Sequence, residues 1–440
     1  MKLAPKAVLD AMLTDEARYQ RWLDVEAALA LSQGELEVIP EEAALLIKEK
    51  ANVEYLDMSQ YASLYEQTGH PMVSLLKLFQ SAVGKNGEYI HLGATTQDIM
   101  DTGMMLLLKE VWGLTRSCLL EIEDELLCMS ERYADTIMAG RTHNIQALPI
   151  TFGFKVAVWA REIRRNIERL SESEKRNFVI QLSGAVGTLA AFANKGFEIQ
   201  SLVAKKLSLE VPDITWHASR DRICEIVNTL ALVSGTMARI AQEVYLLMAT
   251  EIGELTEGWT EGKVGSSTMP HKINPVHCQH VMASARSIRY IAAQIMEDMV
   301  VDHERNMVHF IDERVKLEEL CGLMGEVLTR SVDMLENLFV DEVRMRKNLD
   351  ILKGAMQSEA VMLVLGKSMG KQTAHEVVNA AATKAVREGL DLAQLLMDDS
   401  RVRQYISREE LDELLNPEGY TGQAGKIVRQ VVALSRKERE

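Results

Sequence analysis

The chain has 440 residues, more than one domain usually holds, so we expect two or three subdomains that share a large core. Its 64 acidic and 49 basic residues give a net charge of −15, which argues against nucleic acid or an anionic membrane as a general partner. Five cysteines without a C-x-x-C pair, a start without signal-peptide character, and no apolar run of about 18 residues predict a soluble cytoplasmic protein that spans no membrane.

Proline is rare along the chain and leaves long tracts free of it. Only eight prolines occur, none between Pro71 and Pro149 or between Pro275 and Pro417. Because these tracts are rich in Ala, Leu, Met, Glu and Lys, they predict long helices and an all-α fold. We divide the chain into an N-terminal helical domain (1–110), a central long-helix bundle (111–350) and a C-terminal helical domain (351–440).

The first of these domains should hold short amphipathic helices, one beginning at Asp15 and the next at Pro40. His70 lies where an irregular polar stretch gives way to a helical pattern, and a histidine there is more often a helix cap or a solvated residue than a catalytic group. The block GATTQD, from Gly93, places hydroxyls and backbone donors ahead of a helix. It either binds a carboxylate at the helix N-terminus or is a plain N-cap with Asp98 in the first turn.

Two long helices are expected next, one over residues 104–132 and one after Pro149. The block GRTHNIQ, residues 140–146, lies between them in an otherwise apolar region. Polar groups in such a place need partners, which either solvent or a ligand supplies. We interpret this block as an interhelix turn, with both possibilities open.

The strongest periodicity in the chain covers residues 223–247. Apolar residues there step by three and four without a break: Ile223, Ile226, Leu230, Val233, Met237, Ile240, Val244 and Leu247. Neighbouring positions are apolar too, so this helix should bury more than one face inside a bundle that is shared between subunits. Two further long helices are expected at 281–299 and 317–338, and a smaller helical domain from about residue 350.

The stretch from 252 to 279 interrupts these helices with a glycine-rich, polar composition. Gly265 allows the backbone to approach a ligand closely, Ser266 and Ser267 offer hydroxyls and N–H groups, and Lys272 adds a cation. Pro270 and Pro275 restrict the backbone around Lys272 and Asn274, which suits an anion site. The alternative is an ordinary Gly/Ser surface loop.

The run GSSTMPHKIN, residues 265–274, resembles the signature of the fumarase/aspartase superfamily, whose members form or break C–N or C–O bonds next to a carboxylate. TGHPMV (68–73), GATTQDIMDT (93–102) and GRTHNIQ (140–146) resemble its first histidine segment, its first carboxylate block and its second histidine region. The resemblance covers nearly the whole chain. It implies a homotetramer with sites assembled from several subunits, a small anionic dicarboxylate or tricarboxylate substrate, and no cofactor or metal.

Elimination beside a carboxylate needs a base, an acid for the leaving group, and fixed positive potential for the aci-carboxylate intermediate. By resemblance Ser266 is the base, its alkoxide held by surrounding dipoles and cations. His143 lies on the leaving-group side, with His70 as its neighbour. The residues that the resemblance assigns to substrate binding are Thr95, Thr96, Gln97, Thr142, Ser267, Lys272, Asn274, Arg220 and Arg305.

Several positions depart from the superfamily's pattern. Gln279 occupies the place of a glutamate that polarises the histidine in the adenylosuccinate lyase and fumarase branches, and a neutral amide cannot raise an imidazole's pKa as a carboxylate does. Phe310 and Ile311 replace serines of the run HERDISHSS-x-ER, and the N-terminus lacks the Arg-Tyr pair of the nucleotide-binding enzymes. These losses point away from substrates that contain AMP. Trp216-His217 is similar instead to the 3-carboxymuconate cycloisomerase branch.

We therefore expect an adenylosuccinate-lyase-family enzyme that splits an N-substituted aspartate or a similar succinyl compound by β-elimination and releases fumarate. The alternatives are a 3-carboxy-cis,cis-muconate cycloisomerase that closes a lactone and a catalytically inactive structural relative. A metal enzyme is a weaker alternative, because helical spacing allows the set His271, His277, Cys278 and His280 to supply two ligands at most.

Overall fold

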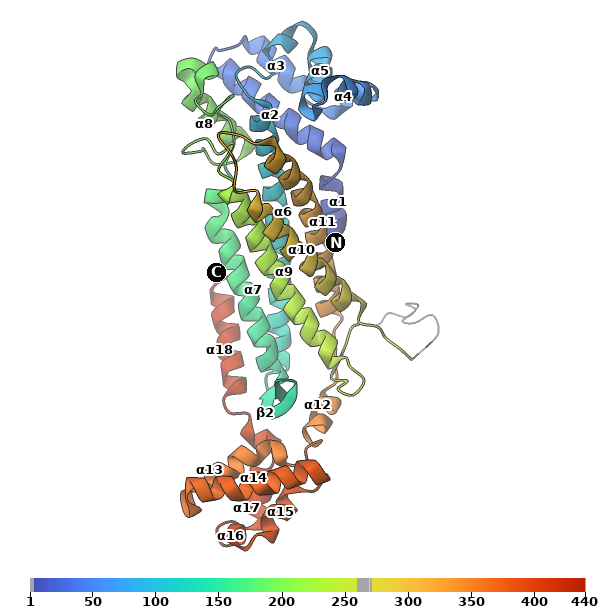
Figure 1. Ribbon diagram of the computed structural model, residues 1–440, viewed down its shortest axis with the longest axis vertical. Helices are drawn as coiled ribbons and strands as arrows, with labels where there is room; N and C mark the ends of the chain where they lie inside the picture. The colour runs from blue at the N-terminus through green and yellow to red at the C-terminus, as the bar shows by residue number, and fades with distance from the viewer. Residues whose placement is uncertain (1–3, 259–268, 270, 440) are drawn as a thin grey trace. The chain divides into compact units, whose positions relative to one another are not determined.

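The computed structural model describes residues 4–258, 269 and 271–439. Within these residues the chain forms eighteen α-helices, six short 3-10 helices and four short strands, so the all-α prediction is confirmed (Figure 1). The long helices are α2 (Asp15–Glu35), α6 (Thr96–Arg132), α7 (Phe152–Asn177), α9 (Asp221–Leu247), α10 (Val276–Glu297) and α11 (Met307–Glu336).

The chain separates into two compact units whose segments alternate along the sequence. Unit 1 comprises Met1–Leu119, Asn166–Ala238 and His280–Arg330, and unit 2 comprises Leu120–Arg165, Arg239–Gln279 and Ser331–Glu440. The long helices α6, α7, α9, α10 and α11 each contribute residues to both units. The division of the chain at residues 110 and 350 stays a prediction.

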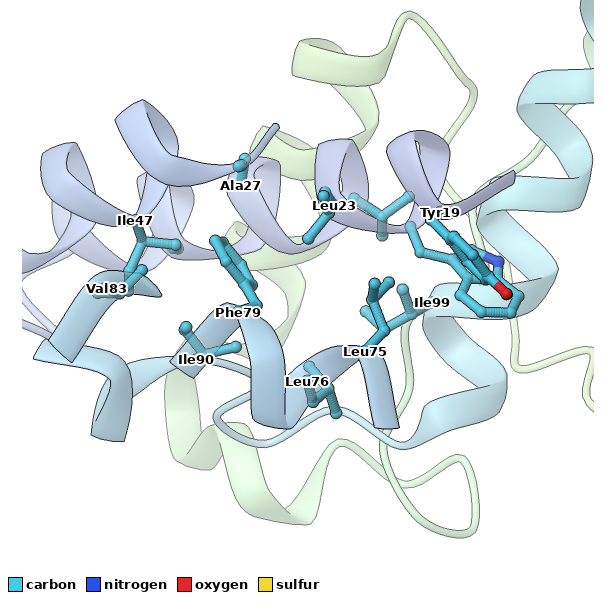
Figure 2. Close-up of a cluster of buried hydrophobic side chains, with 14 of the residues drawn as sticks. Tyr19, Leu23, Ala27, Ile47, Leu75, Leu76, Phe79, Val83, Ile90 and Ile99 are labelled. Carbon is cyan, nitrogen blue, oxygen red and sulfur yellow. The ribbon is translucent and has the colours of Figure 1, made fainter. Parts of the chain in front are cut away.

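Unit 1 contains an apolar cluster built largely between α2 and α5 (Pro71–Val83), with α3 (Glu41–Lys50) beside them. Figure 2 shows the side chains of α2 and α5 pointing toward one another. Their members repeat every fourth residue, which places them on one face of each helix: Tyr19, Leu23 and Ala27 on α2, and Leu75, Phe79 and Val83 on α5. The predicted starts are confirmed, since Thr14 caps α2 just before Asp15 and α3 follows Pro40.

Helix α9 carries the predicted seam, and all eight seam residues are buried. Leu232 and Leu246 on the same helix are 55% and 37% exposed, so an apolar part of its surface lies uncovered in the single chain. The helix is long and apolar enough to cross a membrane by length and composition. However, 67% of its most apolar window is buried inside the protein, which is typical of a core helix.

Three helices begin earlier than the sequence pattern indicated. Helix α6 starts at Thr96 instead of residue 104, α10 at Val276 instead of residue 281, and α11 at Met307 instead of residue 317. The first turns of α6 contain Asp98, Asp101 and Thr102, which suggest a loop when they are read alone. All three are buried and hydrogen-bonded to other segments of unit 1, so tertiary contacts make these polar residues compatible with a helix.

One prediction for unit 2 is wrong, because residues 140–146 do not form a simple interhelix turn. They belong to an antiparallel hairpin of β1 (Ile137–Thr142) and β2 (Ile145–Thr151), with Thr142 opposite Ile145. The two turn residues, His143 and Asn144, have φ of 52° and 64°, as a tight two-residue turn of the I′ type requires. The sequence did not indicate strand β2 because it contains Pro149, and a proline usually argues against a strand.

The remainder of unit 2 is helical. Strand β3 (Leu255–Thr256) pairs with β4 (Phe339–Val340), which leads into α12 (Glu342–Leu349). A second apolar cluster joins α13 (Ser358–Met369), α14 (Lys371–Glu388), α15 (Leu392–Asp398), α16 (Ser400–Arg403) and α17 (Arg408–Leu414). Figure 1 shows these helices gathered together. The remaining helices are α18 (Ala424–Lys437) in unit 2, and α1 (Pro5–Met12), α4 (Tyr61–Thr68) and α8 (Gly196–Leu207) in unit 1.

Candidate active site

The predicted site residues fall in both units. His70, Thr95, Thr96, Gln97, Arg220 and Arg305 belong to unit 1, and Thr142, His143, Lys272 and Asn274 belong to unit 2. Ser266 and Ser267, predicted as base and neighbour, lie outside the described residues.

In unit 1 the start of α6 is organised by Asp98, which is completely buried. Its carboxylate accepts hydrogen bonds from the backbone N–H groups of Thr95 at 3.0 Å, Ser183 at 3.0 Å and Gly184 at 2.9 Å. It also lies 2.8 Å from Nε2 of His217. A buried anion is stable only with several such donors, so Asp98 fixes three chain segments around the GATT block.

The side chain of Thr95 is held by a second predicted residue. Arg305 donates from Nη1 to Oγ1 of Thr95 at 3.0 Å and from Nη2 to the carbonyl of Ala185. Thr95, Thr96 and Arg305 are all half-buried, and Thr96 opens α6. A guanidinium beside a helix N-terminus creates positive potential there, which suits a carboxylate. The structure thus brings two of the predicted substrate-binding residues together.

Gln97 and Arg220 are buried and serve as supports in this geometry. Gln97 donates from Nε2 to Asp101 at 3.0 Å and to the carbonyl of His217 at 3.2 Å. Arg220 donates to both oxygens of Asp101, at 2.9 and 3.0 Å, and to both oxygens of Glu313. Burial alone lowers the pKa of Arg220, but the two carboxylates raise it above its ordinary value. Because its guanidinium is occupied, Arg220 is better explained as a support than as the predicted substrate contact.

His70 is the N-cap of α5, as the cap interpretation predicted. Its Nδ1 accepts a hydrogen bond from the backbone N–H of Val73 at 3.4 Å, which leaves Nε2 as the nitrogen that carries the proton. Partial burial, together with the positive charge of Arg314, lowers the pKa of His70. His70 is thus a neutral hydrogen-bond donor at neutral pH, which fits a residue that orients a substrate.

Arg314 was not among the predicted site residues. Arg314 is half-buried, and its positive charge acts on His70 by lowering the pKa of the imidazole. It also lines a small cavity in unit 1 with Phe310 and Met104. The signal that could have found it is the arginine that closes the run His303–Arg314, which resembles HERDISHSS-x-ER.

In unit 2 His143 and Thr142 are exposed at the turn of the β1–β2 hairpin. Lys272 and Asn274 come just before α10, where Lys272 is exposed and Asn274 is half-buried. The buried carboxylate of Glu257 accepts from the backbone N–H groups of His277 at 3.0 Å and Cys278 at 2.6 Å, and so caps this helix. The same carboxylate fixes the chain that directly follows Lys272 and Asn274.

The histidine and cysteine set considered for a metal does not converge in the described part of the chain. His280 lies 3.2 Å from Glu326, and His277 lies 4.0 Å from Asp333. Cys278 is buried, and burial together with Glu257 raises the pKa of its thiol, so it stays protonated. Gln279, at the position of the superfamily's glutamate, is exposed on α10.

The two residues typical of the cycloisomerase branch are buried in unit 1. Trp216 donates from its indole to the carbonyl of Ile180 at 2.9 Å, and His217 lies between Asp98 and Thr215. Both side chains therefore stabilise the scaffold around the GATT block.

Comparison with known proteins shows that this chain is related to enzymes. Residues 4–296 match a family model described as a lyase, and residues 354–431 match one described as the adenylosuccinate lyase C-terminus. N-acetyl-S-(2-succino)cysteine lyase of Dickeya dadantii (strain 3937) is 37% identical over 422 residues, which cover 96% of this chain and 93% of that protein. Adenylosuccinate lyase of Methanocaldococcus jannaschii is 39% identical over 422 residues, which cover 95% and 91%.

Among solved structures, the 3-carboxy-cis,cis-muconate lactonizing enzyme of Pseudomonas putida superposes with a TM-score of 0.92. Its sequence is 33% identical, and the match covers 99% of this chain and 98% of that one. Proteins with three different reactions thus share the fold and most of the length of this chain.

Proposed function

We propose that this chain, which belongs to the lyase family of the fumarase/aspartase superfamily, eliminates a small thiol or amine from a succinyl compound and releases fumarate. The observation that carries the proposal is the Thr95–Arg305 pair at the start of α6, held in place by Asp98. It offers fixed positive potential to one carboxylate of a succinyl group. Elimination next to that carboxylate requires such potential, because negative charge builds up on it in the transition state.

In the proposed mechanism Ser266 removes the proton next to a carboxylate, a role that rests on the resemblance of the signature motif. Lys272 and Asn274 stabilise the aci-carboxylate, and the capped start of α10 fixes the chain that follows them. His143, exposed at its hairpin turn, faces the leaving group, and His70 donates a hydrogen bond from Nε2. No residue in this sequence of steps calls for a cofactor or a metal.

The leaving group is proposed to lack a nucleotide phosphate. Where the adenylosuccinate lyase run has serines, this chain has Phe310, which packs against the apolar cluster of unit 1, and Ile311, which is exposed. Neither side chain hydrogen-bonds a phosphate. This favours a small thiol or amine over AMP, and one of the relatives is named for a succinylated cysteine.

Gln279 supports a thiol over an amine. A thiol has a pKa of about 8.5 and leaves as an anion with little help, whereas an alkyl amine must be protonated as it leaves. A histidine that lacks a carboxylate partner at position 279 is a weaker acid catalyst. A succinyl thioether therefore fits the chain better than an N-substituted aspartate.

The second candidate, a muconate cycloisomerase, is favoured by the superposition with the lactonizing enzyme. Its reaction needs the same positive potential at a carboxylate, so the Thr95–Arg305 pair serves both. Trp216 and His217 do not separate the two candidates, because both are buried supports.

The exposed apolar residues Leu232 and Leu246 on α9 support the further proposal that copies of the chain assemble into a homotetramer. A cytoplasmic location, a small anionic substrate and no nucleic-acid or membrane partner belong to the same proposal.

The experiment that tests the proposal compares kcat/KM for N-acetyl-S-(2-succino)cysteine, a set of N-succinyl amines, adenylosuccinate and 3-carboxy-cis,cis-muconate. We expect the thioether to be the best substrate and adenylosuccinate to be poor. A higher kcat/KM for adenylosuccinate contradicts the leaving-group proposal. Turnover of the muconate alone identifies a cycloisomerase, and inactivity on the whole set identifies an inactive relative.

A further inference from the structure

The hairpin that carries His143 is fastened close to its turn by a buried ion pair. Arg141, two residues before His143, donates from Nη1 to Oε2 of Glu254 at 2.9 Å and from Nη2 to Oε1 at 2.6 Å. The side chain of Glu254 is 0% exposed and that of Arg141 is 15% exposed. Both belong to unit 2, and Glu254 directly precedes β3.

The second strand of the hairpin reaches the same carboxylate through Asn348 of α12. Asn348 donates from Nδ2 to Oε1 of Glu254 at 2.7 Å and to the carbonyl of Ile252 at 2.9 Å. Its own carbonyl accepts from Nε2 of Gln146 on β2 at 3.0 Å. Both strands of the hairpin are thus connected to one buried carboxylate.

The hairpin needs such an anchor. A two-stranded hairpin is only marginally stable alone in water, and here both turn residues, His143 and Asn144, adopt left-handed backbone conformations. Its turn is exposed, so packing does not fix the position of His143. The ion pair of Arg141 beside the turn fixes the direction of the strand that leads to His143, because a bidentate Arg–carboxylate pair permits one orientation.

We propose that Arg141, Glu254 and Asn348 form a hairpin clamp that fixes the position of His143 relative to Glu254 and strand β3. In this assignment Arg141 and Glu254 are positioning residues, and they act on the substrate only through His143. The inference deepens the proposed function and rests on the role of His143 in it.

A buried ion pair has an alternative role, which is to contribute to folding stability alone. Unit 2 contains a control in Arg164 of α7, which donates from Nε to Glu123 of α6 at 2.7 Å, is also bidentate, and is more deeply buried than Arg141. Glu123 also pairs with Arg439 at 3.0 Å, and among the described residues neither of these ion pairs involves the hairpin. Arg164→Lys therefore reports what weakening a buried pair does without moving His143.

The test measures kcat and KM for the best succinyl substrate in Arg141→Lys, Glu254→Gln and Arg164→Lys. We expect kcat to fall by about 100-fold in the first two variants, because a displacement of about 1 Å at a catalytic group costs that much. KM should change by less than about 3-fold, because these variants remove no contact that binds the substrate in its ground state. In a His143→Ala background, Arg141→Lys should produce no further loss, while Arg164→Lys acts the same in both backgrounds.

Equal losses in Arg141→Lys and Arg164→Lys, or a full additional loss of Arg141→Lys in the His143→Ala background, overturn the clamp. Hydrogen exchange of the amides of β1 and β2 provides a readout that does not depend on activity. We expect faster exchange of these amides in Arg141→Lys and unchanged exchange in Arg164→Lys. If the wild type turns over no succinyl compound, the proposed function fails, and unchanged hairpin exchange in Arg141→Lys then separately overturns the clamp.

Discussion

At the scale of single residues, the site in unit 1 combines two kinds of charged side chain. Some are fully paired with other protein groups, and one guanidinium, that of Arg305, can still bind an anion. Asp98 and Arg220 are saturated by partners and hold the scaffold, whereas Arg305 meets only a hydroxyl and a carbonyl in the part of the chain that the structure describes. A guanidinium that contacts no carboxylate within the described residues retains the capacity to bind an anion. Arg305 is therefore the residue on which substrate binding should depend most.

We expect Arg305→Met to raise KM for a succinyl substrate by roughly 100-fold and Thr95→Val by roughly 10-fold, as expected for lost hydrogen bonds to a charged group. The change in kcat should be smaller in Thr95→Val. Initial-rate kinetics measure both parameters, with Arg176→Met as control, because Arg176 is exposed and pairs with Glu225 at the surface of the same unit. An unchanged KM in Arg305→Met contradicts the assignment.

Asp98→Asn should destabilise the protein. The asparagine oxygen replaces only part of an acceptor that serves three backbone N–H groups and His217, and its NH2 faces donors. Breaking a buried charged network by removing one partner costs about 3 kcal/mol of the free energy of unfolding. Denaturant unfolding measures this loss, and a variant as stable as the wild type would show that Asp98 is not the organising group.

The pKa of His70 is lowered by burial and by Arg314, and both effects favour the neutral imidazole in the folded state. Since the unfolded chain binds this proton more readily, the contribution of His70 to stability is complete above its ordinary pKa of 6.5 and is lost as pH falls from there through the lower folded value. Arg314→Met should move the pKa of His70 upward. An NMR titration of the imidazole measures it, and an unchanged value would exclude Arg314 as a cause.

At the scale of elements, the sequence was most informative where one periodicity decides the structure. The seam of α9 repeats over 25 residues, Ile223 to Leu247, and every member is buried. The early turns of α6 were missed because Asp98 and Asp101 suggest a loop until their distant partners are known. The hairpin at 137–151 was missed because His143-Asn144 is an unusual I′ turn and Pro149 lies in a strand.

Substitutions in the buried seam of α9 and at its exposed apolar positions should change the free energy of unfolding by different amounts. Ile240→Ala removes a completely buried side chain and should cost about 3 kcal/mol of unfolding free energy in the chain itself. Leu232→Ala, at a position 55% exposed in the single chain, should cost little when the chain is dissociated. Chemical denaturation at low protein concentration measures both, and equal losses would contradict the burial pattern.

At the scale of the whole molecule, two conclusions could be drawn from the sequence and one could not. The all-α fold and the superfamily were predictable, because proline-free tracts and a ten-residue motif each carry strong signals. The supporting or binding role of individual polar residues was not, since Arg220 and Arg305 are indistinguishable until Asp101 and Glu313 are seen to occupy only the first. The roles of Ser266 and Ser267 still rest on resemblance.

The proposed homotetramer is tested through the apolar surface of α9. Leu232→Glu should disrupt assembly and abolish activity together, because the resemblance implies sites built from several subunits. Sedimentation velocity measures the mass of the assembly at the concentrations used for the assay. A wild-type monomer with full activity, or a dissociated variant that keeps full activity, contradicts this part of the account.

The central claim is that the chain eliminates a leaving group from a succinyl compound with Ser266 as base. The most direct measurement is an NMR assay of N-acetyl-S-(2-succino)cysteine that quantifies fumarate and free thiol in the same sample, for the wild type and for Ser266→Ala. We predict that the wild type releases fumarate and thiol in equal amounts and that Ser266→Ala releases neither. Release that persists in Ser266→Ala, or loss of substrate without fumarate, would contradict the account.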